Sequence, residues 1–138
     1  NDNNIATKHE VLSDHQAQLV EQMAALVLAL DEQQQPIFNL VAFVDLMLAN
    51  TVPLAQRKTC LQGADSILRG GVQYASMRTK LMSLFDVNDG ELAQILAEQA
   101  LSVDEIEPAA QERYKTYQFI LTVREFLLLG YFTAQNTR

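Results

Sequence analysis

Apolar side chains recur at helical spacing along most of the chain. From residue 14 to residue 33 they stand three or four positions apart, as Leu19, Val20, Met23, Leu26, Val27 and Leu30. This pattern predicts a first helix from about Asp14 to Gln33. Ser13 and Gln16 have the spacing of a capping box, which favours a helix start at that point. We therefore interpret residues 1–12 as a flexible lead-in and residues 13–138 as a single helical domain.

The same spacing predicts five further helices, separated by proline, glycine and asparagine. Their approximate ranges are 37–49, 53–69, 72–85, 89–96 and 109–129, with a linker at 102–108 before the last one. We expect Gly130 to end the last helix, because glycine is the preferred residue just beyond a helix terminus. No apolar residues alternate in the manner of strands, so the expected fold is all-α, a single compact bundle of about six helices.

The second helix is unusually apolar. Its small or polar residues Asn39, Ala42, Asp45 and Ala49 fall on one arc of roughly 120°, and large apolar residues cover the rest of its surface. Such a helix is either central in a bundle or covered by another chain, and the sequence leaves both interpretations open.

Arg124 breaks the pattern of the last helix. It lies within about 60° of Ile120 and Leu127 on the apolar side, where a lone guanidinium would be costly to bury. We expect a structural ion pair between Arg124 and Asp45, the sole charge of the second helix. The alternative is that Arg124 reaches a rim and stays hydrated.

Composition narrows the functional classes. The chain has 138 residues, of which 49% are hydrophobic, and its 10 basic and 17 acidic residues give a formal net charge of −7. This sign disfavours non-specific binding to nucleic acid and to anionic membrane surfaces. The uninterrupted apolar runs, such as residues 126–129, are too short to cross a bilayer, so we expect no direct membrane span.

Few residues suggest catalysis. His9 and His15, with Glu10 and Asp14, could be arranged around a metal, but we interpret both histidines as solvated. Cys60 lies beside apolar residues and is expected to be a free, buried thiol. No phosphate-binding loop or nucleophile motif is present. We therefore predict a chain that is not an enzyme, with no catalytic residues, no cofactor and no metal of its own.

The last helix and its continuation resemble a known family. The run Arg124-Glu125-Phe126-Leu127-Leu128-Leu129-Gly130-Tyr131-Phe132-Thr133 is similar to the carboxy-terminal signature of the gluconate 2-dehydrogenase subunit 3 family. The apolar helix around residues 41–48, with its aspartate, and the basic stretch Gln56-Arg57-Lys58 also resemble that family. The resemblance spans about residues 12–134.

The resemblance implies a small, non-catalytic accessory subunit without a cofactor. Such subunits accompany a flavoprotein of the glucose-methanol-choline type that oxidises sugars or alcohols, often with a cytochrome c subunit, and many are thought to assist its twin-arginine export. The resemblance thus implies a periplasmic protein. The chain begins with Asn1 rather than Met, which is compatible with the removal of a signal segment. The alternative function is a stand-alone helical binding protein for an apolar ligand, held between the second and last helices.

The expected partner-binding residues are Leu129, Tyr131 and Phe132, together with part of the second helix. Leu129 falls on the polar stripe of its helix, and large apolar side chains near a chain end are difficult to bury in a small domain. The alternative is that Tyr131 and Phe132 fold back and close the helix end.

Overall fold

The computed structural model describes residues 9–29, 37–69 and 76–136. Within these ranges the chain forms six α-helices and no strand. The helices are α2 (Asp14–Val27), α3 (Ile37–Thr51), α4 (Leu54–Arg69), α5 (Met77–Phe85), α6 (Asp89–Gln99) and α7 (Gln111–Asn136). The 3₁₀ turn η2 (Val103–Glu105) lies in the predicted linker before α7. A second 3₁₀ turn, η3 (Pro108–Ala110), occupies the predicted start of the last helix, so that α7 begins two residues later than predicted. The predicted all-α bundle of about six helices is confirmed.

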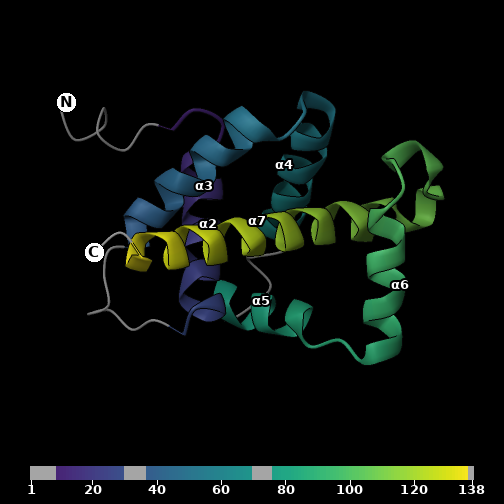
Figure 1. Ribbon diagram of the computed structural model, residues 1–138. Coiled ribbons are helices and arrows are strands. Elements are labelled where there is room, and N and C mark those ends of the chain that lie inside the picture. The colour runs from purple at the N-terminus through teal and green to yellow at the C-terminus, as the bar shows by residue number, and fades with distance from the viewer. Residues whose placement is uncertain (1–8, 30–36, 70–75, 137–138) are drawn as a thin grey trace.

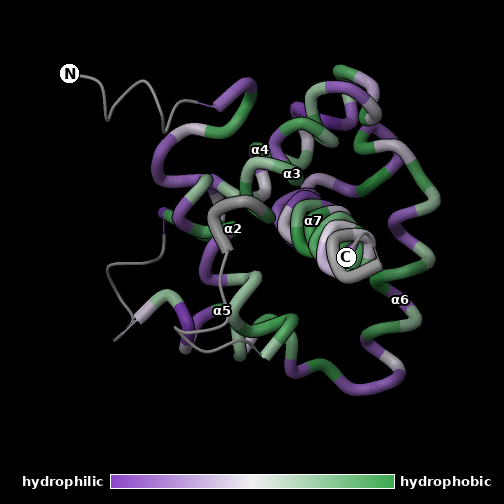
Figure 2. The backbone as a smooth tube through the Cα atoms, turned by 60° about the vertical axis from the view of Figure 1, so that its left-hand side comes forward, coloured by the Kyte–Doolittle hydropathy of each residue, from purple (hydrophilic) through white to green (hydrophobic). Residues whose placement is uncertain are grey.

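Helix α7 is the element around which the others are arranged. It crosses the middle of the molecule in Figure 1, with α3 and α4 above it, α5 below it and α6 beside its first turns. It contacts α2, α3, α4 and α6. Figure 2, viewed almost along α7, shows α2 and α6 on opposite sides of it. The fully buried side chains of the core come from five helices and include Phe119, Val123 and Leu127 of α7, Leu19 and Met23 of α2, Leu48 of α3, Ile67 of α4 and Leu81 of α5.

Side-chain caps set several of the helix starts. Ser13 and Gln16 form the predicted capping box at the start of α2, and Asn88 and Glu91 form a second one at α6. Ser76 caps α5, so that helix begins at Met77. The predicted start at Val72 lies outside the described residues.

Helix α2 ends earlier than its apolar pattern predicts. It stops at Val27, and Ala29 adopts the left-handed conformation with φ of 53°. A left-handed residue just after the last turn is a common way for a helix to end, although glycine usually supplies it. Because alanine rarely adopts this conformation, the sequence carried no signal for the stop. The rest of the predicted helix, from residue 30 to residue 33, lies outside the described residues.

Helix α7 continues past Gly130, contrary to the prediction. Gly130 is buried inside the helix and has no positive φ. A Cβ at this position would lie 2.7 Å from Cδ2 of Phe43 and 3.2 Å from Cδ2 of Leu40. Glycine therefore serves here to let α3 approach α7, and the packing of α3 against this turn stabilises the helical conformation.

A second glycine brings α4 against α7. A Cβ on Gly63 would lie 2.0 Å from the backbone oxygen of Lys115 and 2.5 Å from its carbonyl carbon. The two helix backbones are thus in direct contact at this point, which only a residue without a side chain permits.

The predicted flexible lead-in is wrong for residues 9–12. Leu12 is buried in the hydrophobic core, and the backbone of residues 10–12 is hydrogen-bonded to α3. Residues 1–8 lie outside the described part of the chain. In that described part, no helix has both the length and the apolar character needed to cross a membrane.

Candidate functional site

The C-terminal turns of α7 bring two of the three predicted partner-binding residues to the surface. Leu129 is 47% exposed and Phe132 is 56% exposed. They stand three positions apart and therefore lie on the same side of the helix. We call Leu129, Tyr131 and Phe132 the terminal patch.

Tyr131 is only half-buried and joins the terminal patch to the core. Its ring meets the ring of Phe132 edge-on, with the centroids 5.5 Å apart, and it packs against the buried cluster. Tyr131 and Phe132 thus both belong to helix α7, which continues to Asn136. The alternative, in which both fold back to close the end of a helix that stops at Gly130, is wrong.

The predicted second helix, α3, packs most of its described large apolar side chains inside the bundle, in line with the first of its two interpretations. Val41, Val44 and Leu48 of α3 are buried in the core, and Leu46 is its one large apolar side chain described as exposed. Part of α3 therefore reaches the surface, but most of its apolar side chains are used inside the bundle.

Asp45 is buried rather than on a polar face. Its side chain is 3% exposed, and it accepts hydrogen bonds from three successive backbone amides. Oδ2 accepts from Glu10 N at 2.6 Å, and Oδ1 accepts from Val11 N at 2.9 Å and Leu12 N at 3.0 Å. Nδ1 of His9 lies 4.0 Å from Oδ2. Asp45 therefore fixes the segment that leads into α2 against α3.

The predicted ion pair between Asp45 and Arg124 is wrong. Arg124 is exposed on α7, and among the described residues the group within ion-pairing distance of Asp45 is His9. The physical reason is that three amide N–H groups already satisfy the carboxylate, so its burial does not require a cation. Arg124 reaches solvent, as the alternative interpretation stated.

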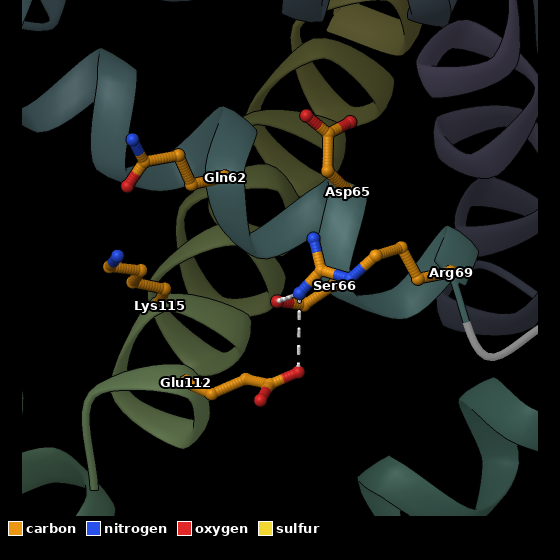
Figure 3. Close-up of a pocket in the computed structure, with 6 residues that line it drawn as sticks. All are labelled: Gln62, Asp65, Ser66, Arg69, Glu112 and Lys115. Atoms are coloured by element: carbon orange, nitrogen blue, oxygen red, sulfur yellow. Dashed lines mark hydrogen bonds and ion pairs between the residues drawn. The ribbon is translucent and has the colours of Figure 1, made fainter. Parts of the chain in front are cut away.

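A polar groove lies between α4 and α7. It has a volume of about 330 Å³ and is lined by Gln62, Asp65, Ser66, Arg69, Glu112 and Lys115. Figure 3 shows the guanidinium of Arg69 between Ser66 and Glu112, with hydrogen bonds of 3.1 and 3.4 Å. Asp65 accepts a hydrogen bond of 2.9 Å from Nε2 of the buried Gln16. Nothing in the sequence pattern pointed to this groove, because its residues come from two helices more than 40 positions apart.

The groove offers little chemistry. Its two carboxylates and two cations balance each other, and the side chains of Arg69 and Glu112 are largely exposed. An exposed ion pair of this kind contributes little energy and holds neither partner in a fixed position. We therefore assign no catalytic or binding role to it.

Cys60 is a free, buried thiol, as predicted. Its sulfur lies 3.7 Å from the backbone oxygen of Gln118 and 3.7 Å from Oγ1 of Thr122. Burial raises the pKa of the Cys60 thiol, and the hydrogen bond with Thr122 opposes that shift in part. A thiol in this environment is protonated and unreactive at neutral pH.

The two histidines have different environments. His15 is exposed, as expected, whereas His9 is half-buried beside Asp45. Within the described residues, no group of three or more His, Cys, Asp and Glu side chains is placed to hold a metal ion.

Arg57 caps the C-terminal end of α3, a role that the sequence pattern did not predict. Its NH2 group donates to the backbone oxygens of Ala49 at 3.0 Å and Val52 at 3.4 Å, where α3 ends. A cation at this end satisfies free carbonyl groups and interacts favourably with the helix dipole.

Comparisons with known proteins returned no match: no family model, no curated protein and no solved structure is significantly similar to this chain.

Proposed function

We propose that this chain is a non-catalytic accessory subunit that binds a larger protein through the terminal patch. The observation that carries this proposal is the exposure of Leu129 and Phe132 on the same side of a helix. Large apolar side chains held in place lose little conformational entropy on binding, and aromatic residues are frequent anchors of interfaces. Gly130 supports the same surface from behind, because it seats this turn directly on α3.

The nature of the partner comes from the resemblance of residues 124–133 to the gluconate 2-dehydrogenase subunit 3 family. On that basis the partner is a periplasmic flavoprotein of the glucose-methanol-choline type, possibly with a cytochrome c subunit. The chain assists its export and oxidises nothing itself.

The alternative, a binding protein for an apolar ligand between α3 and α7, is less well supported. The two helices are in contact there, with Gly130 against Phe43 and Leu40. The groove between α4 and α7 is lined by charged and polar side chains, which suit an apolar ligand poorly.

The proposal is tested with a Leu129→Asp and Phe132→Ser double variant, co-expressed with a flavoprotein of the glucose-methanol-choline type from the native host. We expect the variant to fold but to recover at most about a tenth of the flavoprotein that the wild type recovers, because truncating interface anchors typically costs more than ~1.4 kcal/mol.

Leu54→Asp is the matched control, since Leu54 is a 71% exposed leucine on α4, away from the terminal patch. It introduces the same charge and should leave recovery unchanged. Wild-type recovery with the double variant, confirmed as folded by circular dichroism, would exclude the terminal patch as the docking surface.

A further inference from the structure

Helix α6 presents a broad apolar face that nothing in the described structure covers. Leu92 is 38% exposed and Leu96 is 51% exposed. Three alanines on the same side are also exposed, so the face consists of Leu92, Ala93, Leu96, Ala97 and Ala100. At about 100° per residue these five positions span roughly 140° of the circumference. We call this set the α6 face.

The opposite side of α6 is the one that attaches it to the molecule. Ile95 is buried, Arg113 NH2 lies 2.6 Å from Oε2 of Glu98, and Nε2 of Gln99 donates to the backbone oxygen of Tyr114 at 3.3 Å. These contacts hold α6 against the first turns of α7, and Figure 1 shows it there at the edge of the molecule. The α6 face therefore points away from α7.

The charge around the α6 face is strongly one-sided. Residues 81–112 contain eight acidic and no basic residues, whereas the rest of the chain contains nine acidic and ten basic residues. The entire net negative charge of the protein is thus concentrated in this segment. Exposed carboxylates flank the face at both ends, with Asp89 and Glu91 in the first turn of α6 and Asp104, Glu105 and Glu107 beyond its C-terminus.

We propose that the α6 face is a second docking surface, which binds a basic amphipathic helix of a partner protein. Two exposed leucines among alanines offer an apolar strip about 12 Å long, enough for two turns of a helix. The acidic residues at both ends attract lysines or arginines that flank the apolar residues of such a segment.

Charge complementarity favours a basic helix over two other possible ligands of the α6 face, a second copy of this chain and an anionic lipid surface. A second copy of the chain would bring the same acidic segment to the contact, and like charges facing each other would oppose association. Anionic lipid is repelled for the same reason.

The α6 face is also distinct from the terminal patch. Helix α6 is attached near Arg113 and Tyr114, and the terminal patch begins about 23 Å further along α7, at Leu129. The two surfaces can be occupied at the same time, and either one can fail its test without the other.

The test uses the full chain and a synthetic amphipathic helix of leucine and lysine, about 18 residues long, so that it is helical when bound. A glutamate-for-lysine peptide of the same pattern and a scrambled leucine–lysine peptide serve as control ligands. Binding is measured by isothermal titration calorimetry, and the contact is mapped by amide chemical shifts of the ¹⁵N-labelled protein. We expect that, of the three peptides, only the amphipathic leucine–lysine peptide binds, and that its chemical-shift changes are concentrated in residues 89–105.

Two double variants distinguish the contribution of apolar contacts to peptide binding from the contribution of charge. Leu92→Ser with Leu96→Ser leaves the net charge unchanged and should weaken binding about tenfold or more, whereas the matched control Leu54→Ser should not. Asp104→Asn with Glu107→Gln should weaken binding at about 0.05 M salt but much less at about 0.5 M, where charges are screened.

Several results would overturn the proposal. Equal binding of the scrambled peptide or of the leucine double variant would mean that charge alone attracts the ligand. Shift changes confined to the C-terminal turns of α7 would place the contact elsewhere. A dimer in sedimentation that excludes the peptide would assign the α6 face to a second copy.

Discussion

Asp45 shows how a charge on an apolar helix can be buried without a cation. Its two oxygens accept the amides of Glu10, Val11 and Leu12. Hydrogen bonds to a charged group are stronger than those between neutral groups, and leaving them unmade in a buried site is costly. One side chain therefore fixes the path of the chain into its first described helix.

Replacing Asp45 with asparagine should destabilise the protein by about 1.5–3 kcal/mol, because one acceptor oxygen becomes a donor that faces backbone N–H groups. Urea denaturation measures the loss, and amide hydrogen exchange at Val11 and Leu12 should accelerate. Arg124→Gln is the control and should change stability by less than about 0.5 kcal/mol. Equal effects of the two substitutions would instead support the ion pair.

Cys60 provides a pH-dependent prediction. Burial raises the pKa of its thiol above the ordinary value of 9.0, so the folded protein keeps the proton where the unfolded chain has begun to lose it. The stability contributed by the protonated thiol is therefore fully present below about pH 9 and is lost as the pH rises through the raised folded pKa.

A thiol reagent should modify Cys60 at least about a hundredfold more slowly in the folded protein than in urea at neutral pH, because the thiolate is the reactive form. The absorbance of the leaving group that the reagent releases measures the rate of modification in the folded protein and in urea. Equal rates would show that the sulfur is accessible in the folded state.

At the scale of elements, helix contacts depend on positions without a side chain. Gly63 places α4 against the backbone of Lys115, and Gly130 seats α7 on Phe43 and Leu40. Gly90 serves no such purpose, because a Cβ there would meet only Oδ1 of Asn88, at the ordinary distance of 3.4 Å. Glycine therefore has opposite effects on stability at different helical positions.

Alanine at these three glycines should give a graded series. Gly63→Ala should cost about 3 kcal/mol, since backbone atoms must move apart. Gly130→Ala should cost less, because the ring of Phe43 can shift, and Gly90→Ala should stabilise α6 by up to about 0.5–1 kcal/mol. Thermal and urea unfolding measure the three values. A neutral Gly63→Ala would contradict the close contact between α4 and α7.

At the scale of the molecule, stability is unevenly distributed around α7. Helices α2, α3 and α4 share with α7 the large buried side chains of the core, whereas Ile95 is the buried residue of α6. An element that buries little apolar surface opens at lower free energy than the rest of its domain. The acidic α6 region is thus a part of the described chain that a bound partner could stabilise.

Native-state hydrogen exchange should show this difference directly. We expect amides in the middle of α6 to exchange through a local opening, at least about tenfold faster than those around Phe119 and Val123 of α7, which require global unfolding. Binding of a basic amphipathic peptide should slow exchange in α6 selectively. Uniform protection across both helices would contradict a separate opening of α6.

Sequence alone determined the helical class, most helix starts and the environment of Cys60. These properties are local: apolar periodicity, capping residues such as Ser13 and Asn88, and the apolar neighbours of a cysteine act within a few turns. The exposure of Leu129 could be predicted for the same reason, because it falls on the polar stripe of its own helix. The sequence pattern placed Phe132 beyond the helix end, so only the structure shows that Phe132 stands on the same turns of α7. What the terminal patch binds stays a prediction.

Tertiary structure decided which partners distant residues have. Asp45 could have met Arg124 or backbone amides, and Gly130 could have ended a helix or allowed close packing. Both choices depend on where α3 lies relative to α7 and to residues 10–12. The free face of α6 is likewise visible only once Ile95 and Glu98 are known to attach its other side to α7. Side-chain pattern specifies which surfaces are apolar, but only packing in three dimensions decides which of them are covered.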